Sequence, residues 1–217
     1  MNKKFQFSEK DKNLVKEAVQ ALEKESSGEI VVYFARSSDD YLEACWKLAA
    51  IFGLIMSVSM GVLSWLWLLP QDIMIPQVVE TIVISMVVGY FIPFFIRSLR
   101  LGFVSESKVS QRVITKAHDV FLQEQMFDTI DRTGLLIYIS ELEHQVHVMG
   151  DKGINEKIEQ KDWQDIVQLV IAGIKSNHIA EGISNAIGKC KELLLANGFT
   201  ARENNTNELS DDMRIED

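Results

Sequence analysis

The stretch LAAIFGLIMSVSMGVLSWLWLL, at residues 48–69, contains no charged side chain in 22 positions. A helix of that length spans about 33 Å at about 1.5 Å per residue, and a hydrocarbon core is about 30 Å thick. A second run, TIVISMVVGYFIPFFI at residues 81–96, has no charge in 16 positions and reaches spanning length when it is extended toward its N-terminal side. The two runs predict a transmembrane helical hairpin with spans at residues 46–69 and 77–96.

The charged residues that flank the hairpin predict which side faces the cytoplasm. The connection at residues 70–77 has no Lys or Arg. The opposite ends of the two spans carry Arg36, Lys47, Arg97 and Arg100. Because an excess of Lys and Arg marks cytoplasmic loops, we expect both termini in the cytoplasm and the connection outside. The alternative is a hairpin buried in a large soluble core, although soluble helices rarely run this long without a charge.

The overall charge excludes one class of function. The formal net charge is -9, whereas nucleic-acid-binding proteins present basic surfaces, so we expect no nucleic-acid partner. An anionic inner leaflet also repels a negative protein, so the apolar spans must provide the contact with the lipid bilayer. The separation of the two cysteines, Cys45 and Cys190, fits neither a disulfide framework nor a metal site.

The polar sequence on the two sides of the hairpin predicts a single α/β domain. Before the hairpin, Ser8 begins a helix with apolar residues at three- and four-residue spacing, and Ser26-Ser27-Gly28 ends it. The run EIVVYFA at residues 29–35 predicts a strand buried on both faces. One helix and one strand cannot bury their own apolar surfaces, so their packing partners must lie beyond the hairpin.

The sequence after the hairpin supplies these partners. Two further strands are predicted, LLIYIS at residues 135–140 and HQVHVM at residues 144–149. Three further helices are predicted at residues 105–126, 162–176 and 179–196. The predicted fold class is therefore α/β, a small three- to four-stranded sheet flanked by about four helices, with an inserted transmembrane helical hairpin.

This pattern divides the chain into four segments. They are a first domain part at residues 1–41, the hairpin at 42–98, a second domain part at 99–198 and an acidic tail at 199–217. The tail has few apolar residues and an excess of acidic ones, so we expect it to be disordered in the cytoplasm. Partner binding by the tail is the alternative.

A family resemblance lies in TGLLIYISELEHQVHVMGDKGI, at residues 133–154. The turn DRTG at residues 131–134, the two strands, the charged turn at residues 141–143 and the loop GDKGI at residues 150–154 resemble the core of the TPM domain. The inserted spans resemble a bacterial membrane-protein branch of that family. The resemblance implies a TPM-like fold in the bacterial inner (cytoplasmic) membrane. It also implies acid phosphatase activity, calcium binding or assistance to membrane-complex assembly as candidate functions.

Three aspartates, Asp128, Asp131 and Asp151, are candidate metal ligands. Asp131 precedes the strand at residues 135–140 and Asp151 follows the strand at residues 144–149, so antiparallel pairing would bring both to one end of the sheet. Carboxylate and carbonyl oxygens at that end would suit calcium. The alternative is that these aspartates cap turns through hydrogen bonds to the backbone.

Other catalytic chemistry has less support. The sequence contains no Gly-rich phosphate loop and no Cys-x5-Arg motif, and the usual signature of an aspartyl phosphatase does not surround Asp128 or Asp131. His144 and His147 are three apart on a predicted strand, so we expect them to point to opposite faces and not to chelate one metal. No catalytic residue is assigned.

Small residues recur on one face of the first span. Gly53, Ser57 and Gly61 are four residues apart, a spacing that permits close helix contact within the hairpin or between copies in a homo-oligomer. Taken with the resemblance, this predicts a membrane-anchored, non-enzymatic factor that binds another membrane protein or assists its assembly. The alternative is a weak, metal-dependent, acid-phosphatase-like hydrolase.

Overall fold

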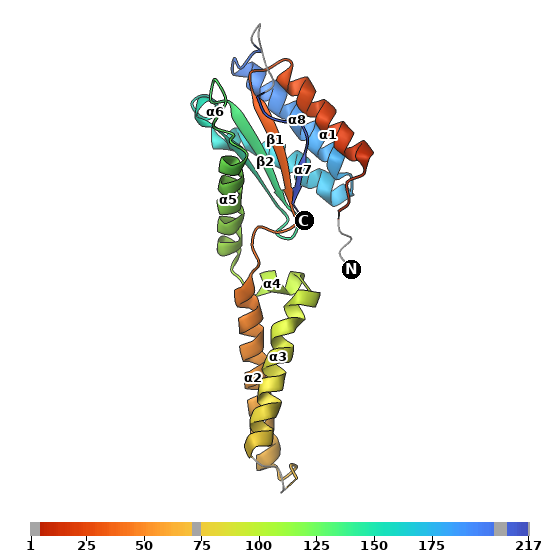
Figure 1. The fold of residues 1–217 in the computed structure, drawn as a ribbon, viewed down its shortest axis with the longest axis vertical. Coiled ribbons are helices and arrows are strands. Elements are labelled where there is room, and N and C mark those ends of the chain that lie inside the picture. The colour runs from red at the N-terminus through yellow and green to blue at the C-terminus, as the bar shows by residue number, and fades with distance from the viewer. Residues whose placement is uncertain (1–4, 71–74, 202–207, 217) are drawn as a thin grey trace. The chain divides into compact units, whose positions relative to one another are not determined.

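The computed structural model describes residues 5–70, 75–201 and 208–216 (Figure 1). The chain divides into two compact units, of which unit 1 comprises residues 1–38 and 110–217 and unit 2 comprises residues 39–109. Unit 1 is an α/β domain and unit 2 is a helical hairpin. The chain therefore begins in one folded unit, forms a second and returns to the first.

A mixed four-stranded sheet forms the centre of unit 1, with the strand order β3-β2-β1-β4. The strands are β1 (Glu29–Ala35), β2 (Gly134–Ser140), β3 (Gln145–Gly150) and β4 (Arg214–Glu216). β1 lies parallel to β2 over the full length of both strands, and β2 lies antiparallel to β3. The predicted α/β fold class is confirmed, and so is the prediction that the first strand finds its partner beyond the hairpin.

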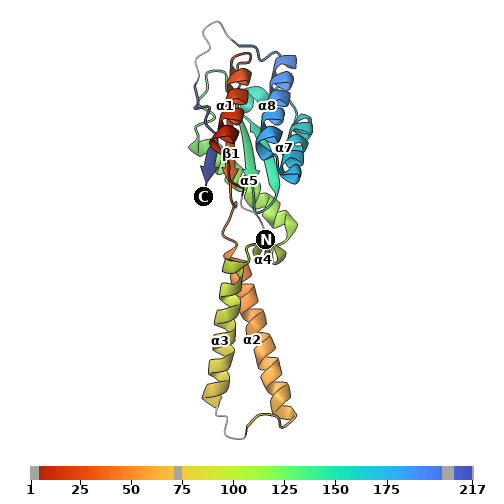
Figure 2. The same cartoon turned by 90° about the vertical axis from the view of Figure 1, so that its right-hand side faces the viewer.

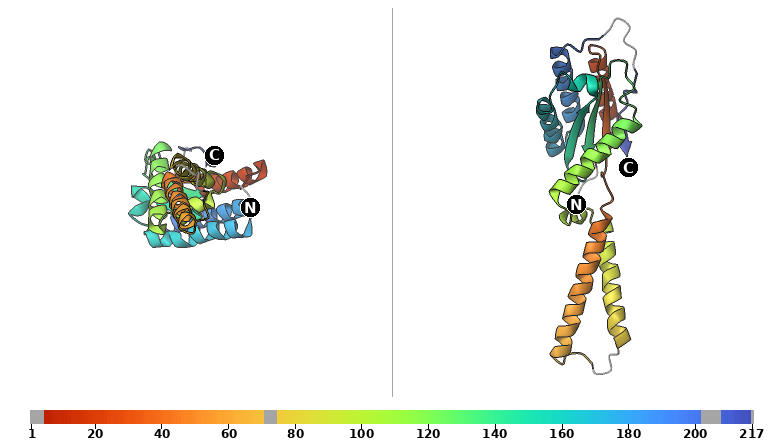
Figure 3. Two further views of the ribbon diagram at one scale, coloured as in Figure 1. Left: turned by 90° about the horizontal axis from the view of Figure 1, so that it is seen from below. Right: turned by 90° about the vertical axis from the view of Figure 1, so that its left-hand side faces the viewer.

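Helices cover both faces of the sheet because alternate side chains of β1 and β2 point to opposite faces. The helices on one face are α1 (Glu9–Glu23), α7 (Gln164–Ser176) and α8 (Ile179–Ala196). α5 (Glu106–Gln123) crosses the other face, as the right-hand view in Figure 3 shows. Ile30 of β1 belongs to the first core and Val31 to the second. The short helices α6 (Lys152–Asn155) and η1 (Gln160–Trp163) lead from β3 to α7.

Local sequence signals explain where these helices begin and how two of them pack. Ser8 caps α1 as predicted, since its hydroxyl accepts a hydrogen bond from the Asp11 N–H while the Asp11 carboxylate accepts one from the Ser8 N–H. α7 and α8 approach closely at Gly173 and Gly182, where a Cβ on either residue would lie 2.7 Å from the Cα of the other. The two glycines therefore set the distance between these helices.

The C-terminal segment corrects one prediction. β4 pairs in parallel with β1 through Tyr33↔Arg214, Phe34↔Ile215 and Ala35↔Glu216, so the disordered tail predicted for residues 199–217 is wrong for these residues. Phe199 is also buried in the core. A strand of three residues with one apolar side chain is too short to show a hydrophobic pattern in the sequence. Ion pairs with residues far away in the chain hold it instead. Residues 202–207 and 217 lie outside the described residues.

Unit 2 contains two helices that are long and apolar enough to cross a membrane. α2 (Leu42–Trp65) has 24 residues and α3 (Ile75–Phe95) has 21, and the short α4 (Ser98–Gly102) follows. In the most apolar stretch of each long helix, 17% and 11% of the residues are buried. α2 begins and ends about four residues before the predicted span at residues 46–69, and it ends at Trp65 because Leu66 and Trp67 form a turn.

The two long helices meet at small residues. A Cβ on Gly53 of α2 would lie 2.6 Å from the side chain of Met86, and a Cβ on Gly89 of α3 would lie 2.9 Å from Phe52. The Ser85 hydroxyl donates to the Phe52 carbonyl at 3.1 Å. Toward the connection the helices diverge (Figure 2), and no atom of the described chain comes within 4 Å of a Cβ placed on Gly61. The predicted contact within the hairpin is confirmed at Gly53 and not at Gly61.

Candidate functional site

The loops that carry the predicted metal ligands lie at one end of the sheet. β2 and β3 are antiparallel, which is the arrangement that the candidate metal site requires, so the loop before β2 and the loop after β3 are neighbours. The Asp151 N–H donates to the Gly134 carbonyl at 2.8 Å, and the Gly153 N–H donates to the Arg132 carbonyl at 2.9 Å. A Cβ on Gly153 would lie 2.4 Å from the Asp131 carbonyl oxygen, so only glycine permits this approach.

The carboxylate of Asp151 forms an ion pair with Arg132. The Arg132 guanidinium donates from Nε to Oδ2 at 2.5 Å and from Nη2 to Oδ1 at 3.1 Å, a bidentate pair. The Asp151 side chain is 7% exposed, whereas that of Arg132 is 51% exposed. Arg132 reaches this position from a left-handed backbone conformation with φ of 58°. The pair ties the two loops together and satisfies a buried carboxylate.

The other two aspartates of the predicted site, Asp128 and Asp131, are exposed. Across the described residues, no group of three or more His, Cys, Asp or Glu side chains is arranged to hold a metal ion. The Asp131 carbonyl oxygen and the Asp151 carboxylate do lie on adjacent loops. The calcium site stays a prediction, and a cation there would compete with the Arg132 guanidinium for Asp151.

The histidines occupy different local structures. β3 begins at Gln145, so the prediction that His144 is the first residue of the strand is wrong. His144 lies in the turn with φ of 52°, a left-handed conformation that some tight turns contain. His147 lies within β3, where burial and then the nearby His118 lower the pKa of its imidazole. His147 is therefore placed to be neutral at physiological pH.

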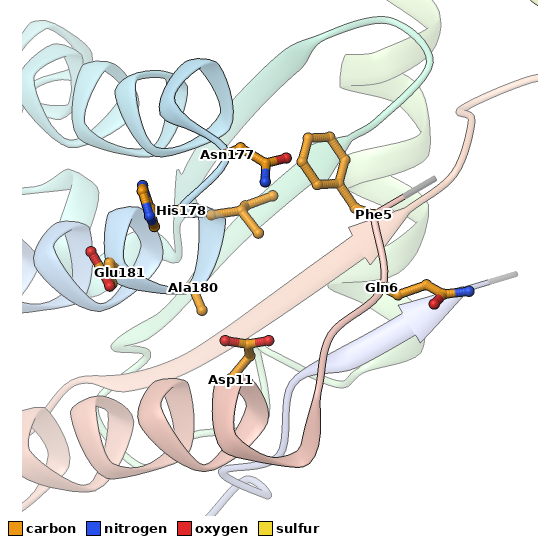
Figure 4. A pocket seen from close by; sticks show the side chains of 8 residues that line it. Phe5, Gln6, Asp11, Asn177, His178, Ala180 and Glu181 are labelled. Carbon is orange, nitrogen blue, oxygen red and sulfur yellow. The ribbon is translucent and has the colours of Figure 1, made fainter. Parts of the chain in front are cut away.

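A small polar pocket of about 270 Å³ lies where α1 and α8 begin (Figure 4). Side chains from the segment before α1 and from the start of α8 line it, including Phe5, Asp11, Asn177, His178 and Glu181. The Asp11 carboxylate already accepts hydrogen bonds from the Ser8 hydroxyl and backbone, which lower the pKa of Asp11. The pocket lies at the N-terminal ends of two helices, where the first backbone N–H groups have no acceptor within the helix. The Asp11 carboxylate in the first turn of α1, however, already caps that helix.

Two buried carboxylates lie beneath the C-terminal segment. Glu23 of α1 is 6% exposed and Glu29 of β1 is 3% exposed. Glu23 accepts a hydrogen bond from the Ile30 N–H at 3.2 Å, and Glu29 accepts from the N–H groups of Glu208 and Leu209 at 3.4 and 3.3 Å. Neither residue was predicted from the sequence, although a glutamate that opens the apolar run at residues 29–35 is a signal in it.

Burial raises the pKa of both carboxyls. Desolvation and then the charge of Glu29 raise the pKa of Glu23 to about 8. Desolvation raises the pKa of Glu29 to about 7, although the two backbone donors partly oppose it. Glu208 and Asp211 of the C-terminal segment add negative charge nearby. This end of β1 is therefore an acidic cluster that holds protons at neutral pH.

A cluster of hydrogen-bonded polar side chains holds the chain in place at the C-terminal ends of β1 and β2. The Ser38 hydroxyl lies 3.0 Å from the Tyr138 hydroxyl and donates to Ser140 Oγ at 3.0 Å. The Ser38 N–H donates to the Glu143 carboxylate at 2.9 Å, and Ser140 also donates to that carboxylate. Glu143 therefore pins the last residues of the first part of unit 1 to the turn between β2 and β3.

Comparisons with known proteins agree with this fold. A family model for the TPM domain matches residues 98–193. The NMR structure of the BA42 protein from the psychrophilic bacterium Bizionia argentinensis is similar, with a TM-score of 0.60, 18% identity and 99% coverage of each chain. At that identity the likeness shows the fold alone. A search of curated proteins found no match. Residues 98–193 of this chain therefore match the TPM domain, in agreement with the resemblance that residues 133–154 carry.

Proposed function

We propose that this protein is a membrane-anchored TPM domain that binds another membrane protein, or assists its assembly, without catalysis. The pairing of β1 with β2 carries the proposal. These strands run side by side from Glu29↔Gly134 to Ala35↔Ser140, although both apolar helices lie between them in the chain. The two helices are thus an insertion within one folding domain, which suits a protein that acts at the membrane.

The exposed surface of the hairpin supports membrane insertion. Large apolar side chains lie exposed along both helices, including Leu54, Ile55, Ile84 and Val87. An apolar surface of this extent is unfavourable in water and marks a membrane or protein interface. The Lys and Arg distribution favours the inner membrane with both termini in the cytoplasm.

A reporter fusion tests the topology. A periplasm-active phosphatase fused between residues 70 and 77 should be active, and the same reporter at the C-terminus should be inactive. The opposite pattern would overturn the orientation and the cytoplasmic placement of the TPM domain.

Photo-crosslinking in membranes tests the partner. A photoreactive residue at Ile84, which is 55% exposed on α3, or at Ile130, which is 71% exposed in unit 1, should give a discrete adduct with another membrane protein. An adduct of twice the mass of this chain would instead indicate the homo-oligomer. Lipid adducts alone, from both positions, would overturn the proposal of a protein partner.

A calcium site, with or without weak phosphohydrolase activity, is the second candidate. The neighbouring loops of Asp131 and Asp151 favour it, since they place a carbonyl oxygen and a carboxylate on adjacent segments of the chain. Calorimetry of the detergent-solubilised chain at millimolar calcium should show binding that Asp151→Asn weakens. No heat at that concentration would remove the site. Release of phosphate from an ester that persists in Asp131→Asn would separate any hydrolysis from this residue.

A further inference from the structure

The edge of the sheet beside β1 is covered by the shortest strand of the fold. β4 has three residues, whereas β1 and β2 pair over seven and β2 and β3 over six. β4 follows an acidic stretch and contributes a single apolar side chain, Ile215, which is 39% exposed. The backbone of β1 would be an open sheet edge without it, and open edges accept other extended segments.

Three ion pairs hold this cover in place. Lys16 of α1 pairs with Asp212 at 2.9 Å, Lys116 of α5 pairs with Glu216 at 2.9 Å, and Arg214 pairs with Glu124 of α5 at 2.8 Å. The Tyr33 hydroxyl also donates to Glu216 at 3.2 Å. The Lys16–Asp212 pair is exposed and stabilises by about 0–1 kcal/mol, whereas the Lys116–Glu216 and Arg214–Glu124 pairs are half-buried.

The start of the cover rests on the buried acidic cluster. Glu29 accepts the N–H groups of Glu208 and Leu209, and it lies near the carboxylates of Glu208 and Asp211. Glu23 accepts the N–H of Ile30 in β1. Desolvated carboxyls of like charge oppose the closed arrangement unless they hold protons. Leu209 and Met213 also pack against the two cores, so the cover is held by two partly buried apolar side chains, three ion pairs and a ladder of only three residue pairs.

We infer that residues 208–216 are an exchangeable cover of the β1 edge, and that an extended segment of the partner protein replaces them there by β-strand addition. The inference rests on the proposed partner-binding function and names its surface. Lys16, Glu124 and Lys116 border the β4 position, and they match Asp212, Arg214 and Glu216. The partner segment is therefore extended and carries a basic residue and, two positions later, an acidic residue, which meet Glu124 and Lys116 of α5.

Peptide exchange into the full-length protein tests this inference. The probe is a fluorescent peptide with the sequence of residues 208–216, and its anisotropy is measured with the protein in detergent micelles. Arg214→Glu in the protein places two carboxylates opposite each other at Glu124 and loosens the attached cover. We expect this variant to bind the peptide at least tenfold more tightly than the wild type does. Lys189→Glu, which breaks a surface pair on α8 instead, should bind as the wild type does.

Further arms of the experiment decide between occupants. A peptide that itself carries Arg214→Glu should lose binding, because it meets Glu124 with the wrong charge. Light scattering should show that Arg214→Glu does not dimerise, and a dimer with exchanged segments would replace the partner with a second copy. An unfolding midpoint within a few degrees of the wild type shows that the variant is folded. A folded variant that binds no peptide overturns the inference.

The outcome is separable from that of the proposed function. If the peptide does not exchange in micelles, the β1 edge is not the binding site. A membrane partner that binds elsewhere on the protein would still be detected by crosslinking. If the peptide exchanges but no membrane partner is crosslinked, the binding site at the edge of β1 is supported and the proposed partner is refuted.

Discussion

Replacing Glu23 with glutamine should remove a pH dependence of stability that the fold builds in. A carboxyl whose pKa is raised by folding binds its proton more tightly in the folded state. The free energy of unfolding is therefore highest below the ordinary pKa of 4.5 and falls as the pH rises to the folded pKa, about 8 for Glu23 and about 7 for Glu29. The charged groups that face the pair, Glu208 and Asp211, have the same sign and act in the same direction.

The magnitude follows from the displacement of the pKa. Each pKa unit corresponds to about 1.4 kcal/mol, so a pKa that moves from 4.5 to about 8 lowers the free energy of unfolding by at most about 5 kcal/mol between those pH values. Glutamine keeps an oxygen that accepts the Ile30 N–H and stays neutral at every pH. Glu23→Gln should therefore match the wild type near pH 5 and exceed its stability by a few kcal/mol near pH 8.

Urea unfolding of the solubilised protein at several pH values measures this difference. The fluorescence of Trp163, which is buried in unit 1, reports the transition. The matched control is Glu25→Gln, which removes an exposed carboxylate paired with Lys191 and should leave the slope with pH unchanged. A wild type whose stability is flat or rises between pH 5 and pH 8 would refute the reasoning, and so would a full slope in Glu23→Gln.

Three further substitutions test other contacts. Gly153→Ala should destabilise unit 1 by about 1–3 kcal/mol, because its Cβ would clash with the Asp131 carbonyl oxygen, and a wild-type urea midpoint would contradict that contact. Arg132→Ala should cost about 1–3 kcal/mol, because it leaves the buried Asp151 carboxylate without its bidentate partner, and Arg132→Lys should recover only part of this in the same assay. Gly182→Val should lower the thermal midpoint by several degrees by separating α7 from α8, whereas Gly188→Ala, at an open position on α8, should not lower it.

The sequence predicts the elements that depend on local pattern. The continuous apolar runs of β1 and β2, which are buried on both faces, the cap at Ser8 and the charge-free runs are all visible in neighbouring residues, and the fold confirms them. The need of one strand for partners also predicts that the hairpin is an insertion. These features follow from apolar spacing and from side chains that act within one turn of the chain.

The features that the sequence does not show depend on residues far apart in the chain. β4 is held by side chains such as Glu124, which lies 90 positions before Arg214. Glu23 and Glu29 have ordinary sequence contexts, and only the C-terminal segment that covers them makes them buried. Asp151 was expected to bind a cation, and it does pair with one, but the cation is the guanidinium of Arg132. A sequence pattern identifies side chains that can bind a cation, but it does not show which side chain of the folded protein already pairs with them.

β1 joins the two parts of the proposed function in one strand. One edge of β1 pairs with β2, and the other carries the exchangeable cover. Its C-terminal end continues through residues 36–38, which Glu143 and the turn after β2 hold, and the chain then enters α2. A segment that adds to β1 therefore binds the strand that leads directly into the anchor. A partner held in the same membrane would present such a segment at high effective concentration, so a cover that pairs with β1 over only three residues is enough to exclude unanchored competitors.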